Sequence, residues 1–159
     1  MDTRSHEDPV EPLYDARIRG VCLISTRAGS RMHLHGGCWL TAAAHRPPRL
    51  LVAFPKEFEG AELVRRGGAF AVSLLAEDQA PLAQAVLGGA TSPAALPGVS
   101  FRRLAAGCPV LEGAVAHFLC SVEGEFGADA DYAGFYGPVS EFGWGRREAP
   151  QLRADQLRG

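Results

Sequence analysis

The clearest alternation of hydrophobic and polar positions lies near the end of the chain, between residues 116 and 126 (AHFLCSVEGEF). Apolar and polar side chains alternate there with period two, which predicts a half-exposed antiparallel strand with Cys120 and Phe126 on its apolar face. The turn-prone residues 127–129 follow, and the run DYAGFYGPVSEF offers a partner strand. The pattern therefore predicts two adjacent strands late in the sequence.

Further strands are predicted earlier in the chain. Residues 18–26 and 49–54 are mostly apolar, as buried strands are, and the second run resumes pairing after Pro47-Pro48. Residues 69–75 place Phe70, Val72 and Leu74 on one face. In a strand over residues 31–35, Met32 and Leu34 would share one face, while His33 and His35 would lie partly exposed on the other.

Two short helices interrupt these strands. One is predicted from Glu59 to Arg66, where Gly67-Gly68 would end it. The other would be capped by Asp78, carry Pro81 in its first turn and run to about Leu87. Because short strands dominate, we expect a mainly β fold, a barrel or a sandwich, rather than a parallel sheet.

Composition narrows the class of protein. The chain has 159 residues, 47% of them hydrophobic and 21% charged, which is typical of one globular domain. A net charge of −2 gives no electrostatic case for nucleic acid, and no apolar stretch approaches the ~20 residues that span a bilayer. The polar first ten residues do not resemble a signal peptide, and the four widely spaced cysteines favour reduced thiols in a cytoplasm. We expect a mobile arm over 1–12, the domain over 13–145, and a tail over 146–159 that either covers a neighbouring subunit or lies in solvent.

Several kinds of catalytic site are not favoured by the residues. His33 and His35, with His45 nearby, have no third ligand at a matching spacing, so we expect no metal site. A Cys38–His35 nucleophile pair is conceivable, but a small thiol in a glycine-rich bend is the simpler interpretation. There is no G-x-S-x-G elbow and no Walker-type phosphate loop.

Residues 36–75 carry a more specific pattern. An aromatic-x-Thr turn (Trp39-Leu40-Thr41) precedes a run of alanines and Pro47-Pro48, and a buried strand, Lys56 and a helix follow. The later segment CPVLEGAVAHFLCSVEGEF continues the same order of features. Over roughly residues 13–141 the chain resembles the flavin reductase-like, FMN-binding proteins. The resemblance implies a Greek-key split β-barrel of six or seven strands with two short helices.

The resemblance also implies a flavin site. Residues of the glycine-rich turn would face the isoalloxazine ring: Gly37, Cys38, Trp39, Leu40 and Thr41. The loop after the buried strand would meet the phosphate through Phe54, Lys56 and Gly60, and Lys56 is the only lysine among sixteen basic residues. Main-chain donors at the ring would stabilise the charge that reduction adds.

Two departures from the family pattern bear on activity. Phe58 and Gly60 stand where many relatives carry Ser or Thr, which implies modest flavin affinity or compensation by Arg65 or Arg66. Ala130-Asp131-Tyr132 stands where flavin-reducing relatives often carry Gly-Asp-His, and Asp131 and Tyr132 are candidate substrate contacts. Tyr132 would either stack on a ring or simply belong to a strand.

The leading hypothesis is an NAD(P)H-dependent flavin reductase that binds FMN, with FAD as an alternative, and works as a homodimer. Nicotinamide or another small molecule would donate electrons, and a flavin-accepting monooxygenase is a candidate partner. No side chain is expected to act as acid or base, because hydride transfer to flavin needs none. One alternative is a flavin-binding electron carrier that does not use nicotinamide, and another is a barrel that has lost flavin.

Overall fold

The main sheet is antiparallel and accounts for most of the chain. The computed structural model describes residues 20–37, 39–57, 59–127 and 129–157. Within these ranges the main sheet has eight strands, which are β1 (Cys22–Ala28), β2 (Arg31–Gly37), β3 (Leu40–His45), β4 (Pro48–Pro55), β5 (Ala69–Leu74), β8 (Ala116–Ser121), β9 (Gly124–Phe126) and β10 (Tyr132–Trp144). A separate ribbon pairs β6 (Phe101–Arg103) with β7 (Pro109–Leu111). The described α-helices are α2 (Glu59–Gly67) and α3 (Ala80–Leu87), and the short 3₁₀ turns are η1 (Glu77–Gln79), η2 (Pro93–Ala95) and η3 (Ala154–Leu157).

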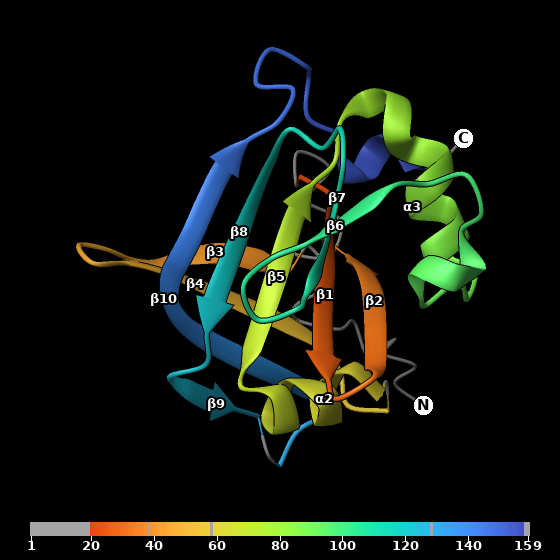
Figure 1. Ribbon diagram of the computed structural model, residues 1–159. Helices are drawn as coiled ribbons and strands as arrows, with labels where there is room; N and C mark the ends of the chain where they lie inside the picture. The colour runs from red at the N-terminus through yellow and green to blue at the C-terminus, as the bar shows by residue number, and fades with distance from the viewer. Residues whose placement is uncertain (1–19, 38, 58, 128, 158–159) are drawn as a thin grey trace, which may run out of the picture.

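The long strand β10 joins the two halves of the split barrel. The strand order is β2-β1-β5-β8-β10-β4-β3, with β9 also paired to β10. The first half of β10, Tyr132 to Pro138, pairs with β4, and the second half pairs with β8 after a register shift between Val139 and Glu141. A shift of this kind bends a strand, and Figure 1 shows β10 curving from one half of the sheet into the other. The expected mainly β split barrel with two short helices is confirmed.

Most of the apolar strands are covered on both faces, which explains why their sequences do not alternate cleanly. The inner face of the barrel buries residues of β1, β4, β5, β8 and β10 together with Ala61 and Val64 of α2. On the outer face of β1, Leu23 packs with α3 and the C-terminal segment. On the outer face of β5, Ala69 and Ala71 pack beneath the β6–β7 ribbon. Both sides of these strands are therefore apolar.

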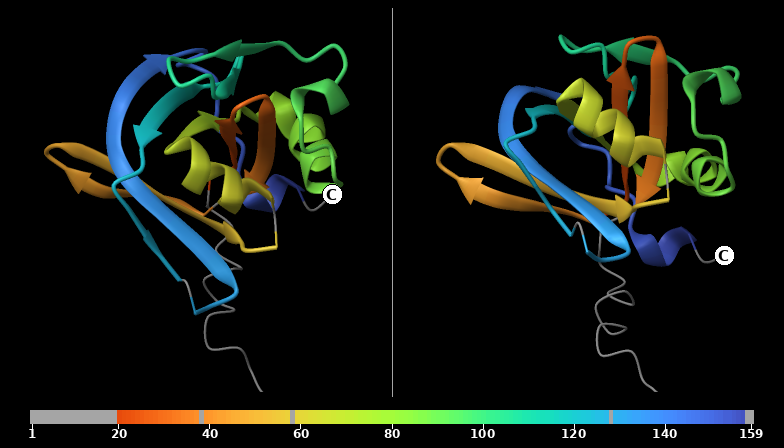
Figure 2. Two further views of the ribbon diagram at one scale, coloured as in Figure 1. Left: turned by 60° about the horizontal axis from the view of Figure 1, so that its bottom comes forward. Right: turned by 90° about the horizontal axis from the view of Figure 1, so that it is seen from below.

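Helix α2 lies across one end of the barrel (Figure 2). Its exposed face is charged, while Leu63 and Val64 are buried. It ends where the glycine pair predicted: Gly68 has φ +70° and its N–H donates to Val64 O at 2.8 Å. The helix fixes the position of the loop that precedes it, because its apolar face is locked into the core.

The prediction of one continuous strand over residues 116–126 is wrong in its second half. Between the pairs Cys120↔Val139 and Gly124↔Tyr136, three residues (121–123) face two of β10 (137–138). One extra residue reverses the alternation of side chains, so Phe126 turns outward and is 44% exposed instead of joining the apolar face. The strand is divided into β8 and β9 at this point.

Three further expectations are corrected. Asp78 does not cap α3: it lies in η1, and its carboxylate accepts two 2.7 Å hydrogen bonds from Arg146. His33 is only 5% exposed, because the face of β2 that carries it turns toward the barrel interior and α2 rather than toward solvent. The main sheet also has more than the six or seven strands expected, because β3 and β9 were not anticipated as separate strands.

The C-terminal segment packs onto its own chain. Leu152 is fully buried in the cluster that includes α3, and residues 151 and 153 form bridges with Ala76 and Gly20. Residues 1–12, expected as an arm, lie outside the described part of the chain. In the part that is described, no helix has the length and apolar character needed to cross a membrane.

Candidate functional site

The predicted ring-binding turn lies at the junction of β2 and β3. Gly37 ends β2, and Trp39 is tied to β4 because its carbonyl accepts a 3.1 Å hydrogen bond from Ala53 N. Leu40 packs against the barrel core, whereas the side chain of Thr41 is exposed. Cys38, also predicted here, lies outside the described residues. The turn thus connects the edge strand β2 to the β3–β4 hairpin, which projects from the body of the barrel (Figure 1).

The predicted phosphate loop connects β4 to α2. Phe54 lies in the core and is 1% exposed. The centroid of its ring lies 5.7 Å from the centroid of the Phe135 ring. The Phe54 side chain is therefore part of the core beneath the predicted phosphate loop. Lys56 follows and is half-buried, and Gly60 lies buried in the first turn of α2. Free N–H groups at the start of a helix favour an anion, as does a nearby ammonium group.

Two contacts join these regions to the predicted substrate residues. The rings of Trp39 and Tyr132 are stacked, with centroids 4.3 Å apart and an interplanar angle of 13°. The Lys56 N–H donates a 3.0 Å hydrogen bond to Asp131 O. Tyr132 therefore both begins β10 and stacks on an aromatic ring. The two contacts therefore bring together segments that are far apart in the sequence.

Two histidines that sequence analysis did not assign to this region also lie in it. His33 and His35 occupy the same face of β2, opposite Thr26 and Ile24 of β1, and Ile24 belongs to the inner core. The His35 ring lies 5.5 Å from that of Phe54. Burial lowers the pKa of both imidazoles, and the pKa of His35, which also feels His33, falls from 6.5 to about 4. The i, i+2 spacing predicted their shared face, but only the packing of α2 and β4 reveals their burial.

The charged groups around this region are unevenly distributed. At the start of α2, Glu59 forms an ion pair with Arg31 of β2. Arg65 is engaged at the other end of the helix, where it contacts Glu125 at 2.6 Å. Arg65 and Arg66 lie at least five residues beyond Gly60, roughly 7–9 Å along the helix axis. They are poorly placed to compensate for missing phosphate contacts near Gly60, which leaves Lys56 as the cation of the loop.

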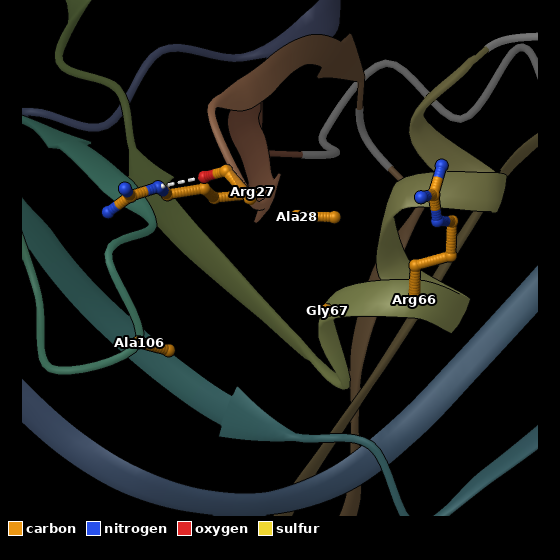
Figure 3. Close-up of a pocket in the computed structure, with 6 residues that line it drawn as sticks. Arg27, Ala28, Arg66, Gly67 and Ala106 are labelled. Carbon is orange, nitrogen blue, oxygen red and sulfur yellow. Dashed lines mark hydrogen bonds between the residues drawn. The ribbon is translucent and has the colours of Figure 1, made fainter.

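A separate hollow of about 480 Å³ lies at the C-terminal end of α2, lined by Arg27, Ala28, Gly29, Arg66, Gly67 and Ala106. Its two arginines lie on opposite sides and their guanidinium groups point in different directions (Figure 3). Arg27 donates a 2.7 Å hydrogen bond to Gly29 O. The C-terminal end of a helix disfavours anions, so this hollow is a weaker candidate than the region around Trp39 and Lys56. Among the described residues no three His, Cys, Asp or Glu side chains gather as a metal-binding group.

Comparison with known proteins identifies the family of the chain. The family model for the flavin reductase like domain matches residues 16–154. The flavin reductase of the styrene monooxygenase from Pseudomonas putida S12 is 30% identical, with a TM-score of 0.73 and 88% of each chain covered. The NADH:FAD oxidoreductase of Streptomyces globisporus C-1027, in complex with NAD and FAD fragments, shares the fold with a TM-score of 0.80 and 22% identity, over 95% of this chain and 92% of that one.

A curated relative places the same domain in a larger protein. The diflavin flavoprotein A 5 of Nostoc sp. (strain PCC 7120) is 31% identical over 117 residues, which cover 72% of this chain. The match covers 20% of that protein, so this chain spans about a fifth of the length of the curated relative. The family model covers most of the present chain, and the barrel matches solved flavin reductases. The chain belongs to the flavin reductase-like family.

Proposed function

We propose that this chain is an NAD(P)H-dependent flavin reductase that binds FMN between the β2–β3 turn, the β4–α2 loop and the start of β10. One observation carries the proposal: the Trp39–Tyr132 stack and the Lys56–Asp131 hydrogen bond join the segments that the family pattern assigns to ring, phosphate and electron donor. The β4–β10 and β3–β4 strand pairs hold these segments side by side.

The residues present fit a planar ring with an anionic tail. Gly37 leaves the main chain of the turn without a side chain at one end, and Trp39 and Tyr132 add aromatic surface. Gly60 at the other end is buried against His33, so its missing Cβ makes room for that imidazole. Lys56 offers a positive charge for a phosphate, and the first turn of α2 offers main-chain N–H groups beside the carboxylates of Glu59 and Glu62. When bound, the flavin would accept a hydride at N5 and hold the electrons. The protein would orient the ring, exclude water and stabilise the added negative charge.

Each predicted residue has a proposed role. The turn residues Gly37, Cys38, Trp39, Leu40 and Thr41 would present main-chain groups to the ring. Lys56 and Gly60 would bind the phosphate, while Phe54 would support the loop from the core. Asp131 and Tyr132 would contact the nicotinamide of NADH or NADPH, with the Tyr132 ring in place of the histidine that relatives often carry.

Reduced flavin would then pass to a second protein or to another acceptor. Relatives with this fold include components of two-enzyme systems, such as the reductase of styrene monooxygenase and the reductase of a bacterial tryptophan halogenase. A flavin-accepting monooxygenase is therefore the partner that we propose.

The proposed assembly is a homodimer that shares the Trp39 turn and the Tyr132–Tyr136 segment. Phe126 lies over this segment: its ring would be 1.9 Å from a Cβ placed on Gly134, and its side chain is 44% exposed. A large apolar side chain that is half exposed beside the site favours burial by a second copy.

A flavin-binding electron carrier that does not use nicotinamide is the second candidate. It is favoured by Tyr132, which stands where flavin-reducing relatives often carry a histidine.

Two measurements on the purified chain separate these functions. The visible absorption spectrum tests flavin binding, and we expect the band of oxidised flavin either as purified or after addition of FMN or FAD. Anaerobic addition of NADH or NADPH should then bleach that band. Flavin binding without bleaching by either nucleotide would support the carrier, and no flavin binding would contradict both functions.

The phosphate assignment is tested by Lys56→Ala. We expect weaker binding of FMN by roughly tenfold, since one charge-assisted hydrogen bond contributes about 1.5 kcal/mol, and unchanged binding of riboflavin, which lacks the phosphate. Fluorescence quenching of each flavin provides the measurement, and Arg66→Ala at the other end of α2 is the control. Equal FMN affinity in the wild type and Lys56→Ala would refute the assignment.

A further inference from the structure

The imidazoles of His33 and His35 lie between the two ends of the proposed flavin site. Both project from β2 onto the inner face, where His33 pairs with Thr26 and His35 with Ile24. Neither residue belongs to the family pattern by which the site was assigned.

His33 packs against the start of α2, the part of the proposed site that would bind the phosphate. A Cβ placed on Gly60 would lie 2.8 Å from His33 Cδ2, closer than real Cβ atoms come to other heavy atoms. The first turn of α2 therefore rests directly on the imidazole ring. Since His33 is 5% exposed, its ring has little room to move away.

His35 is held against the ring end. A Cβ placed on Gly37 would lie 3.4 Å from His35 Nε2. The centroids of the His35 and Phe54 rings are 5.5 Å apart. The polar edge of this imidazole thus reaches the glycine turn that is assigned to the isoalloxazine. The two histidines are neighbours on one face of β2, with His33 against Gly60 and His35 against Gly37.

Both imidazoles have the chemistry of neutral hydrogen-bonding groups. Burial lowers the pKa of each, so at neutral pH each ring keeps one N–H donor and one nitrogen acceptor. An ion pair between Arg31 of β2 and Glu59 of α2 joins the two elements that meet at His33. A neutral donor suits a flavin ring, whose edge carries carbonyl oxygens and nitrogens and gains negative charge on reduction.

We propose that His35 hydrogen-bonds the isoalloxazine ring, and that His33 is a positioning residue that holds Gly60 and the first turn of α2 at the phosphate. The inference rests on the proposed flavin binding and extends it to two side chains. It assigns the ring of the flavin to His35 and the phosphate to His33, so substitutions of the two histidines must affect FMN and riboflavin binding differently.

Riboflavin and FMN distinguish the two roles. For His35→Leu, we expect both flavins to bind more weakly by the same factor, roughly tenfold for one buried hydrogen bond, and the midpoint potential of bound FMN to fall. For His33→Leu, we expect FMN to bind more weakly while riboflavin affinity stays within about twofold. His35→Gln, which keeps a donor and an acceptor, should recover part of the riboflavin affinity.

The measurements are fluorescence quenching and spectroelectrochemical titration, with circular dichroism to establish folding. His45→Leu is the control, because His45 is exposed at the end of β3. Unchanged riboflavin affinity and midpoint potential in both His35 variants would overturn the ring contact. An equal loss of affinity for FMN and for riboflavin in His33→Leu would overturn the positioning role. If the wild type bound neither FMN nor FAD, the proposed function itself would fail.

Discussion

At the scale of single residues, the site depends on glycines that allow other groups to approach closely. Gly60 is the clearest example, since His33 occupies the space that any larger residue would need. The sequence predicted a role for Gly60 only through its place in the phosphate loop. The steric reason becomes visible only when β2 and α2 are packed together.

Gly60→Ala should lower the free energy of unfolding by about 1–3 kcal/mol, the usual cost of forcing an extra methyl group into a packed interior. FMN affinity should fall as well, because α2 must shift. Urea denaturation gives the stability change. Gly36→Ala on β2 is the matched control, because a Cβ there would meet its neighbours at 3.5 Å or more, an ordinary contact. Equal stability of the two variants would contradict the tight contact at Gly60.

The buried His35 makes stability depend on pH in the acid range. Its folded-state pKa is about 4, against about 6.5 in the unfolded chain. Between these values the unfolded chain binds a proton that the folded protein does not, so stability falls as pH drops from 6.5 to 4. The loss attributable to His35 should be of the order of 3 kcal/mol. Denaturation curves at several pH values should show a shallower decline for His35→Gln, and parallel declines would contradict the assignment.

At the scale of elements, local patterns predicted strands and helices well where one pattern persists. The helix at Glu59–Gly67 and its glycine stop are examples. The pattern failed at residues 121–123, where an extra residue reverses the faces, because nothing local marks a bulge that depends on the partner strand. It also missed β3, whose small and mostly exposed residues carry no alternation. The C-terminal segment is the largest surprise, since its few apolar residues gave no sign of packing.

Leu152 anchors that segment and provides its test. Leu152→Ala should lower the free energy of unfolding by about 2–5 kcal/mol, because the side chain is fully buried between α3 and β1. Leu87→Ala makes the same chemical change at a position that is 56% exposed, and should cost far less. Thermal unfolding of both variants gives the comparison. A Leu152→Ala protein as stable as Leu87→Ala would mean that the segment is dispensable.

At the scale of the whole molecule, order and spacing along the chain predicted the family and the mainly β barrel. Convergence of the site could not be predicted from residues alone. The stack of Trp39 on Tyr132 requires both a turn and the start of β10 to be in place. The same holds for the histidines, whose face was predicted correctly but whose burial depends on α2.

The proposed homodimer is a property of the whole molecule and is tested through Phe126. Phe126→Glu should raise the dimer dissociation constant at least tenfold, because it places a charge on the apolar surface beside the site. Leu87→Glu is the control, because it alters an exposed leucine on α3. Sedimentation velocity over a range of protein concentrations measures the effect. A wild type that remains monomeric throughout that range would contradict the dimer.

The double pairing of β10 has a mechanical consequence. One strand supplies hydrogen bonds to β4 in its first half and to β8 in its second. Because one continuous strand carries both sets of hydrogen bonds, loss of order in β10 would disturb both halves of the barrel at once. The barrel should therefore melt as one cooperative unit, even though it is divided into two lobes.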